Sequence, residues 1–264
     1  MILSKINKKP CICASIGSIE TSKVISAVEY AINNNYSCVE IRFDLLNDFN
    51  EELLFNKYLK EIISYCEKFN FPIIATKRNI YKDANNIENK SDIKSDIIID
   101  KLSFLKKLID NGIKTVDIEQ DTTDKYLIAD FIEFAHSKNS EVILSVHDFN
   151  SFIDLEKAMQ FYIEASYLKA DFFKMAAIIT SKQESLDILS ICDKINEIRN
   201  SDIENYPEFI IFGMGDKGKL TRVLSLNYGS FLAYCSADNG LSTAPGQLNI
   251  NLFNKVYNSC NLIF

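Results

Sequence analysis

Residues 141–177 read EVILSVHDFNSFIDLEKAMQFYIEASYLKADFFKMAA, and this stretch decides the fold. Two short apolar runs, EVILSV and ADFFKMAA, have the length of buried strands. Between them, residues 151–169 place apolar side chains at helical spacing. A strand, a helix and a second strand in this order predict a β-α-β unit, which is typical of a parallel sheet covered by helices.

One reactive side chain stands in each of these two predicted strands. His147 ends the first strand and is one of two histidines in the chain, while Lys174 lies in the middle of the second strand. We expect Lys174 to form a Schiff base with a carbonyl substrate and His147 to transfer protons. Both residues also have a structural interpretation. Lys174 can pair with a carboxylate or reach solvent, and His147 can be a hydrogen-bonded core histidine.

The alternation of strands and helices extends over the whole chain. Further strands are predicted at CICASIG, YSCVEIRFDLL, FPIIATKR, KTVDIE, EFIIFGMG and GSFLAYCSA, which are residues 11–17, 36–46, 71–78, 114–119, 208–215 and 229–237. Eight β-α units in 264 residues favour a single-domain (β/α)8 TIM barrel of the α/β class over residues 1–264. An open dinucleotide-binding sheet is disfavoured because no G-x-G-x-x-G follows the first strand.

Local signals set several boundaries of the predicted helices. Asn50 and Ser181 stand at helix starts, and Glu184 completes a capping-box spacing with Ser181. Gly112, after Asn111, is a helix stop. Further helices are predicted at residues 21–35, 126–137, 219–226 and 248–257. Residues 79–95 are polar and predict a long loop.

Composition excludes several classes of protein. A formal net charge of −7 argues against a general nucleic-acid binder. Uncharged runs stay well short of 18 residues, so a membrane protein is not expected. Seven cysteines without a C-x-x-C pair, and no signal-peptide pattern, indicate a protein of the reducing cytoplasm.

Ionisable residues gather where the predicted strands end. In (β/α)8 barrels the carboxyl ends of the strands carry the active site. So many charges at one mouth are costly unless they pair around a polar site. An alternative for Glu40 and Arg42 is a purely structural ion pair. The residues at these strand ends are Glu40, Arg42, Asp44, Arg78, Asp117, Glu119, His147, Asp148 and Lys174.

Two loops after the last strands add candidate ligands. GMGDKGKLTR places Arg222 near the mouth, alone or with Lys217 or Lys219, and arginine suits a carboxylate. A phosphate-binding loop is the competing interpretation of its glycines. LSTAPGQL offers the Thr243 hydroxyl and the Gln247 amide, although it can also be an ordinary helix start.

Five motifs in this order resemble the type I 3-dehydroquinate dehydratase family: EIRFD, SVHDF, the Lys174 segment, MGDKGKLTR and STAPGQ. The resemblance covers roughly residues 10–260. It implies a (β/α)8 enzyme of the shikimate pathway, which serves aromatic amino acid biosynthesis. It also implies a homodimer without metal or redox cofactor, acting on 3-dehydroquinate as a hydro-lyase.

The resemblance further implies roles for single residues. Lys174 would be the Schiff-base lysine, and His147 the general acid and base. Arg222 would take the substrate carboxylate. The residues around the substrate would be Glu40, Arg42, Arg78, Arg222, Thr243 and Gln247, of which Glu40, Arg78 and Gln247 would hold its hydroxyl groups.

Two departures from the family pattern stand out. Family members usually carry Glu-Gly-Gly soon after the arginine of the third strand, where this chain reads NIYKDANN. Asp83 is one residue out of register, so Asp83, Glu119 or another carboxylate orients His147. Thr243 replaces a frequent serine but keeps the hydroxyl.

Two rival functions share parts of this pattern. A class I aldolase would use the same lysine but would not explain STAPGQ together with Glu40 and Arg42. A catalytically silent quinate-type regulator would bind the same ligand on the same barrel without converting it.

Overall fold

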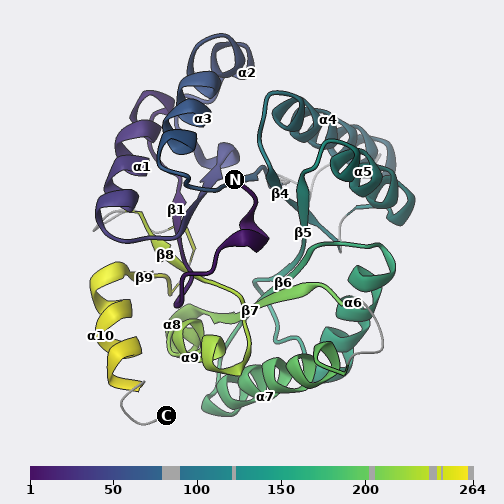
Figure 1. Ribbon diagram of the computed structural model, residues 1–264. Helices are drawn as coiled ribbons and strands as arrows, with labels where there is room; N and C mark the ends of the chain where they lie inside the picture. Colours follow the sequence, from purple (N-terminus) through teal and green to yellow (C-terminus); the bar gives the residue numbers. More distant parts are fainter. Residues whose placement is uncertain (79–89, 121–122, 202–205, 238–242, 245, 261–264) are drawn as a thin grey trace.

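The computed structural model is a curled parallel sheet surrounded by helices (Figure 1). It describes residues 1–78, 90–120, 123–201, 206–237, 243–244 and 246–260. The strands follow the order β7-β6-β5-β4-β3-β2-β1-β8-β9. Their bounds are β1 (Ile12–Ile16), β2 (Cys38–Arg42), β3 (Ile73–Thr76), β4 (Thr115–Glu119), β5 (Glu141–Asp148), β6 (Phe172–Ile178), β7 (Glu208–Met214), β8 (Ala233–Ser236) and β9 (Leu248–Asn249).

The helices form a ring on the outside of this sheet (Figure 1). In the described part of the chain none is long and apolar enough to cross a membrane. Their bounds are α1 (Val24–Asn33), α2 (Glu51–Leu53), α3 (Leu59–Lys68), α4 (Lys90–Asp110), α5 (Lys125–Ser137), α6 (Leu155–Tyr167), α7 (Lys182–Arg199), α8 (Gly215–Gly218), α9 (Thr221–Leu224) and α10 (Ile250–Cys260).

The sheet closes between β7 and β8. Phe231 donates its backbone N–H to the carbonyl oxygen of Phe209 at 2.7 Å. Ile211 donates its own N–H to the Ser230 hydroxyl at 3.2 Å. The paired strands in the described part of the chain all run parallel, as in Ser145 opposite Lys174. The predicted (β/α)8 barrel is therefore confirmed.

The barrel interior has an apolar floor below a polar layer. Since neighbouring side chains of a strand point to opposite faces, only alternate residues face inward. The floor is closed by Leu3 and Ile6, and Leu3 donates its N–H to Glu141 at 2.7 Å. The buried polar side chains of the cavity therefore lie toward the carboxyl ends of the strands. Above the floor residues Ile74, Ile143, Phe172 and Ile210 come the buried polar side chains Ser15, Glu40, Thr76, Asp117, Ser145 and Lys174.

The predicted local signals are mostly confirmed. Asn50 accepts the N–H of Leu53 at 2.8 Å, and the capping box of α7 forms between Ser181 and Glu184. Gly112 follows α4 with a φ of +108°, which a residue with a Cβ adopts only with strain.

Three expected boundaries were wrong. Helix α4 begins at Lys90, so the last six residues of the expected 79–95 loop are helical. Polarity does not separate a loop from a helix start, because lysine has a good helix propensity. The predicted helix at 219–226 is divided into α9 and a 3₁₀ turn. The one expected from residue 248 starts at Ile250, after β9. Residues 79–89 lie outside the described part of the chain.

Candidate active site

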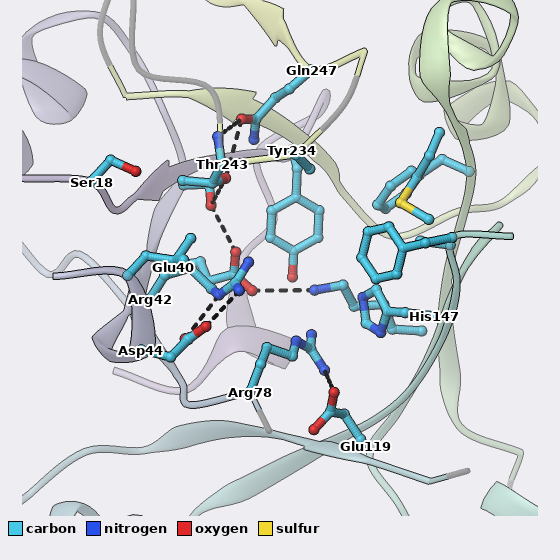
Figure 2. A pocket seen from close by; sticks show the side chains of 18 of the residues that line it. Ser18, Glu40, Arg42, Asp44, Arg78, Glu119, His147, Tyr234, Thr243 and Gln247 are labelled. Carbon is cyan, nitrogen blue, oxygen red and sulfur yellow. Dashed lines mark hydrogen bonds and ion pairs between the residues drawn. The ribbon is translucent and has the colours of Figure 1, made fainter. Parts of the chain in front are cut away.

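A cavity of about 680 Å³ opens at the carboxyl ends of the strands (Figure 2). It lies above the apolar floor, and side chains from strands all around the barrel reach it. The eight residues expected at the site all line it: Lys174, His147, Glu40, Arg42, Arg78, Arg222, Thr243 and Gln247.

Lys174 lies at the bottom of this cavity and is 3% exposed. Its Nζ is 3.2 Å from Glu40 Oε1 and 3.1 Å from Asp117 Oδ2. The same nitrogen lies over the ring of Tyr234, 4.2 Å from the ring centroid. These neighbours fix the amine in place. An amine attacks a carbonyl carbon through its unprotonated form, and both carboxylates lie close enough to accept a proton from Lys174.

Glu40 is held by two hydroxyl groups as well as by Lys174. Ser15 and Thr76 donate to its carboxylate at 2.8 and 3.0 Å. Burial alone would raise the pKa of Glu40, but the charges of Lys174 and Arg42 lower it below its usual value. Glu40 therefore remains an ionised acceptor at the bottom of the cavity.

Asp117 is a second buried carboxylate beside Lys174. The sequence placed it at a strand end but assigned it no role in catalysis or substrate binding. It pairs with Arg78 at 2.8 Å and accepts a hydrogen bond from Ser145 at 2.6 Å. Burial would raise the pKa of Asp117, but Arg78 and Lys174 lower it strongly. The Asp-x-Glu spacing at the end of β4 was a signal for an inward carboxylate. Its contact with Lys174 on β6, two strands away, needs the curvature of the barrel.

Replacing Asp117 by asparagine is expected to lower the free energy of unfolding by about 3 kcal/mol at pH 7, because Lys174 and Arg78 would lose a buried partner. The pKa of Asp117 is lower in the folded chain than when unfolded, where it is about 3.9. The loss is therefore complete above about pH 4 and shrinks as the pH falls further. Denaturant unfolding of both proteins between pH 7 and 3 measures it.

The control for this experiment is Asp216→Asn, which removes an exposed partner of Lys219. That change should alter stability little at any pH. A stability difference between wild type and Asp117→Asn that stays constant down to pH 3 would contradict the assignment.

His147 stands two residues beyond Ser145 on β5, and its Cα is paired with Ala176. Its ring stacks on Phe149 at 6.3 Å between centroids. Burial, together with the charges of Arg78 and Lys174, holds the pKa of His147 well below 6.5. The imidazole is therefore neutral near pH 7 and able to accept a proton.

In the described part of the chain Glu119 makes no hydrogen bond to the Nδ1 of His147. Among the described residues, the buried Nδ1 of His147 has no hydrogen-bond partner. Glu119 instead accepts from the buried Lys101 at 3.0 Å and lies 3.9 Å from Arg78. The other expected partner, Asp83, lies outside the described part of the chain.

The rim of the cavity carries paired polar groups. Arg42 donates to Asp44 at 3.1 and 2.7 Å, through Nε and Nη2. Thr243 donates to the Ser15 hydroxyl at 2.7 Å, and its N–H donates to Gln247 at 2.9 Å (Figure 2). The contact with Ser15 ties Thr243 to β1.

Arg222 reaches the cavity from α9, whereas Lys217 and Lys219 do not line it. Its guanidinium stacks on Phe212, 4.4 Å from the ring centroid, and burial lowers its pKa to about 10. Lys217 binds the carbonyl of Thr180, and Lys219 pairs with Asp216.

The glycines beside Arg222 serve close packing, which removes the main support for a phosphate-binding loop. A Cβ on Gly218 would come within 2.5 Å of the Gly213 carbonyl carbon. This position therefore requires glycine for the approach of the two chain segments.

A family model described as type I 3-dehydroquinase matches residues 12–263. The chain belongs to this family. A 3-dehydroquinate dehydratase of Methanocaldococcus jannaschii is 30% identical over 257 residues, which are 95% of this chain and 99% of the relative. The resemblance inferred from the five motifs is thus confirmed for this type I 3-dehydroquinase.

Solved structures agree on the fold of the dehydroquinase chain. A type I 3-dehydroquinate dehydratase from Clostridium difficile, carrying covalently modified comenic acid, superposes with a TM-score of 0.78 at 22% identity, covering 98% of this chain and 95% of its own. A 3-dehydroquinate dehydratase from Geobacillus kaustophilus gives a TM-score of 0.77 at 21% identity, covering 97% and 92%. These two superpositions establish the fold, whereas the chemistry of the site is argued from the residues of this chain.

Proposed function

We propose that this dehydroquinase eliminates water from 3-dehydroquinate to give 3-dehydroshikimate through a Schiff base on Lys174. The observation that carries the proposal is the buried amine of Lys174, which is held between two carboxylates on the floor of a polar cavity. His147 supports the proposal. Its neutral imidazole lines the same cavity, on the neighbouring strand β5, two residues beyond the residue paired with Lys174.

The chemistry explains why an amine and a base are needed together. A proton next to a ketone is weakly acidic, and conversion of the ketone to a cationic imine provides an electron sink. His147 removes that proton, which leaves an enamine, and then protonates the departing hydroxyl group. Hydrolysis of the imine releases the product and restores Lys174. In this account no redox cofactor or metal takes part.

The other cavity residues hold the substrate in this proposal. Arg222 binds its carboxylate, since a planar guanidinium fixed on Phe212 presents a fork to two oxygens. Glu40, Arg78 and Gln247 hold hydroxyl groups. Arg42 and Thr243 complete the wall, supported by the contacts to Asp44 and Ser15 described above.

The setting of the enzyme is part of the proposal. We infer a single catalytic domain over residues 1–264, which acts as a homodimer in the cytoplasm. It serves a biosynthetic pathway that leads to aromatic amino acids. Nucleic acid and membranes are not among the proposed partners.

The test is a spectrophotometric assay with 3-dehydroquinate as substrate. The conjugated enone product should give a rise in ultraviolet absorbance in proportion to enzyme concentration. A class I aldolase would cleave a carbon–carbon bond and produce no enone. A silent regulator would bind the substrate without any rise, and either result would overturn the proposal.

A further inference from the structure

Tyr234 is a buried aromatic residue of the cavity that the proposed mechanism does not use. It lies on β8, with its Cα paired to Cys13 of β1, and is 3% exposed. Its hydroxyl points into the cavity, on the side of Glu40 (Figure 2).

The Tyr234 hydroxyl is buried and makes no hydrogen bond to any residue that the structure describes. Other deeply buried tyrosines behave differently. Tyr36 donates to the Ser236 carbonyl at 2.6 Å, and Tyr162 donates to the Pro207 carbonyl at 2.9 Å. A buried hydroxyl without a partner destabilises a fold, and such a group in a functional cavity is satisfied when a ligand arrives.

The ring of Tyr234 also lies against the reactive nitrogen. Lys174 Nζ is 4.2 Å from the ring centroid of Tyr234. A substrate carbon bonded to this nitrogen would lie beside the ring, and the oxygen on that carbon would be within reach of the phenolic hydroxyl. The ionised carboxylates of Glu40 and Asp117 can only accept hydrogen bonds. Burial and the charge of Glu40 raise the pKa of Tyr234 well above 10, so its hydroxyl stays a donor.

We propose that the Tyr234 hydroxyl donates a hydrogen bond to the oxygen on the carbon that Lys174 attacks. This oxygen is first that of the substrate ketone and then that of the carbinolamine. The inference deepens the proposed function and rests on it. Tyr234 is then a catalytic residue for imine formation. His147, on β5, which does not pair with β8, removes the proton next to the imine.

The step balances without a further reactant. The Lys174 nitrogen forms a bond to the ketone carbon, and the carbonyl π electrons move to the oxygen. The carbon–oxygen bond then breaks, and water leaves with both protons lost from the ammonium nitrogen. The cationic imine keeps the positive charge of that ammonium. Tyr234 needs only to stabilise the charge that develops on the oxygen, as a donor in an oxyanion hole does.

The experiment compares wild type, Tyr234→Phe and Tyr36→Phe in single turnovers quenched with borohydride. The rate of reduced adduct formation on Lys174 is followed by mass spectrometry. For Tyr234→Phe this rate should fall about 100- to 1,000-fold. The isotope effect of deuterium at C2 should fall toward one, because imine formation becomes rate-limiting. Its Tm should be unchanged or higher, since an unpaired buried hydroxyl is removed.

The Tyr36→Phe control should show the opposite pattern, a lower Tm with an unchanged adduct rate. Three results would overturn the inference: an adduct rate in Tyr234→Phe within about twofold of wild type, a Tm as low as that of the control, or a raised KM with an unchanged adduct rate. The last would place the hydroxyl on another substrate atom. Absence of any adduct in wild type would instead overturn the proposed function.

Discussion

Replacement of Lys174 by alanine is expected to reduce kcat with 3-dehydroquinate by about 10⁴-fold or more, since an attacking nucleophile is lost. A remaining cavity can bind and orient the substrate but cannot convert its ketone to an electron sink. The absorbance assay under saturating substrate measures this loss directly.

Folding must be separated from chemistry in that experiment. Lys174 compensates the charges of Glu40 and Asp117, so its removal leaves two carboxylates close together in a buried place. Lys174→Met keeps most of the side-chain volume and should show the same loss of kcat with near-native circular dichroism. Lys194→Ala, at an exposed position on α7, should retain wild-type activity. Turnover by folded Lys174→Met within tenfold of wild type would contradict the role of the amine.

Replacement of His147 by alanine is expected to slow turnover by about 10²- to 10⁴-fold, as removal of a general base does. Elimination and imine hydrolysis should both be slow, while Lys174 still forms the imine. The trapped adduct on Lys174 should therefore persist and accumulate during turnover. Loss of adduct formation in His147→Ala would show that His147 serves imine formation instead.

The pH dependence of kcat/KM gives a second readout for His147. It must be neutral to accept a proton, and its pKa lies well below 6.5 because of burial and the charges of Arg78 and Lys174. The wild-type profile should therefore fall only at a pH well below 6.5, and this acidic limb should be absent in His147→Ala. The control is His136→Ala, since that histidine lies at the surface, 3.0 Å from Asp171. The His136→Ala variant should keep the wild-type kcat/KM and the acidic limb of its pH profile.

The barrel could be predicted from the sequence because each strand is a short apolar run and each helix has one apolar face. In a parallel barrel all strands end at the same mouth, so residues such as Glu40, Arg78 and His147 could be placed together without coordinates. The match of separate motifs then narrowed the chemistry to one family.

Other features needed the three-dimensional structure. Asp117 was visible at a strand end, but its contact with Lys174 depends on the tilt and curvature of the sheet. Lys101 lies in the middle of α4, and no local pattern indicates that it reaches Glu119. The unpaired hydroxyl of Tyr234 is invisible in a sequence, because an apolar strand with one tyrosine predicts only burial.

The central claim is that catalysis proceeds through an imine on Lys174, and trapping that imine tests it most directly. The enzyme is incubated with 3-dehydroquinate and borohydride, digested, and examined by peptide mass spectrometry. We predict a single reduced adduct on the peptide that contains Lys174, with loss of activity in proportion to its yield. An adduct on another lysine, or continued enone formation in borohydride without any adduct, would contradict the account.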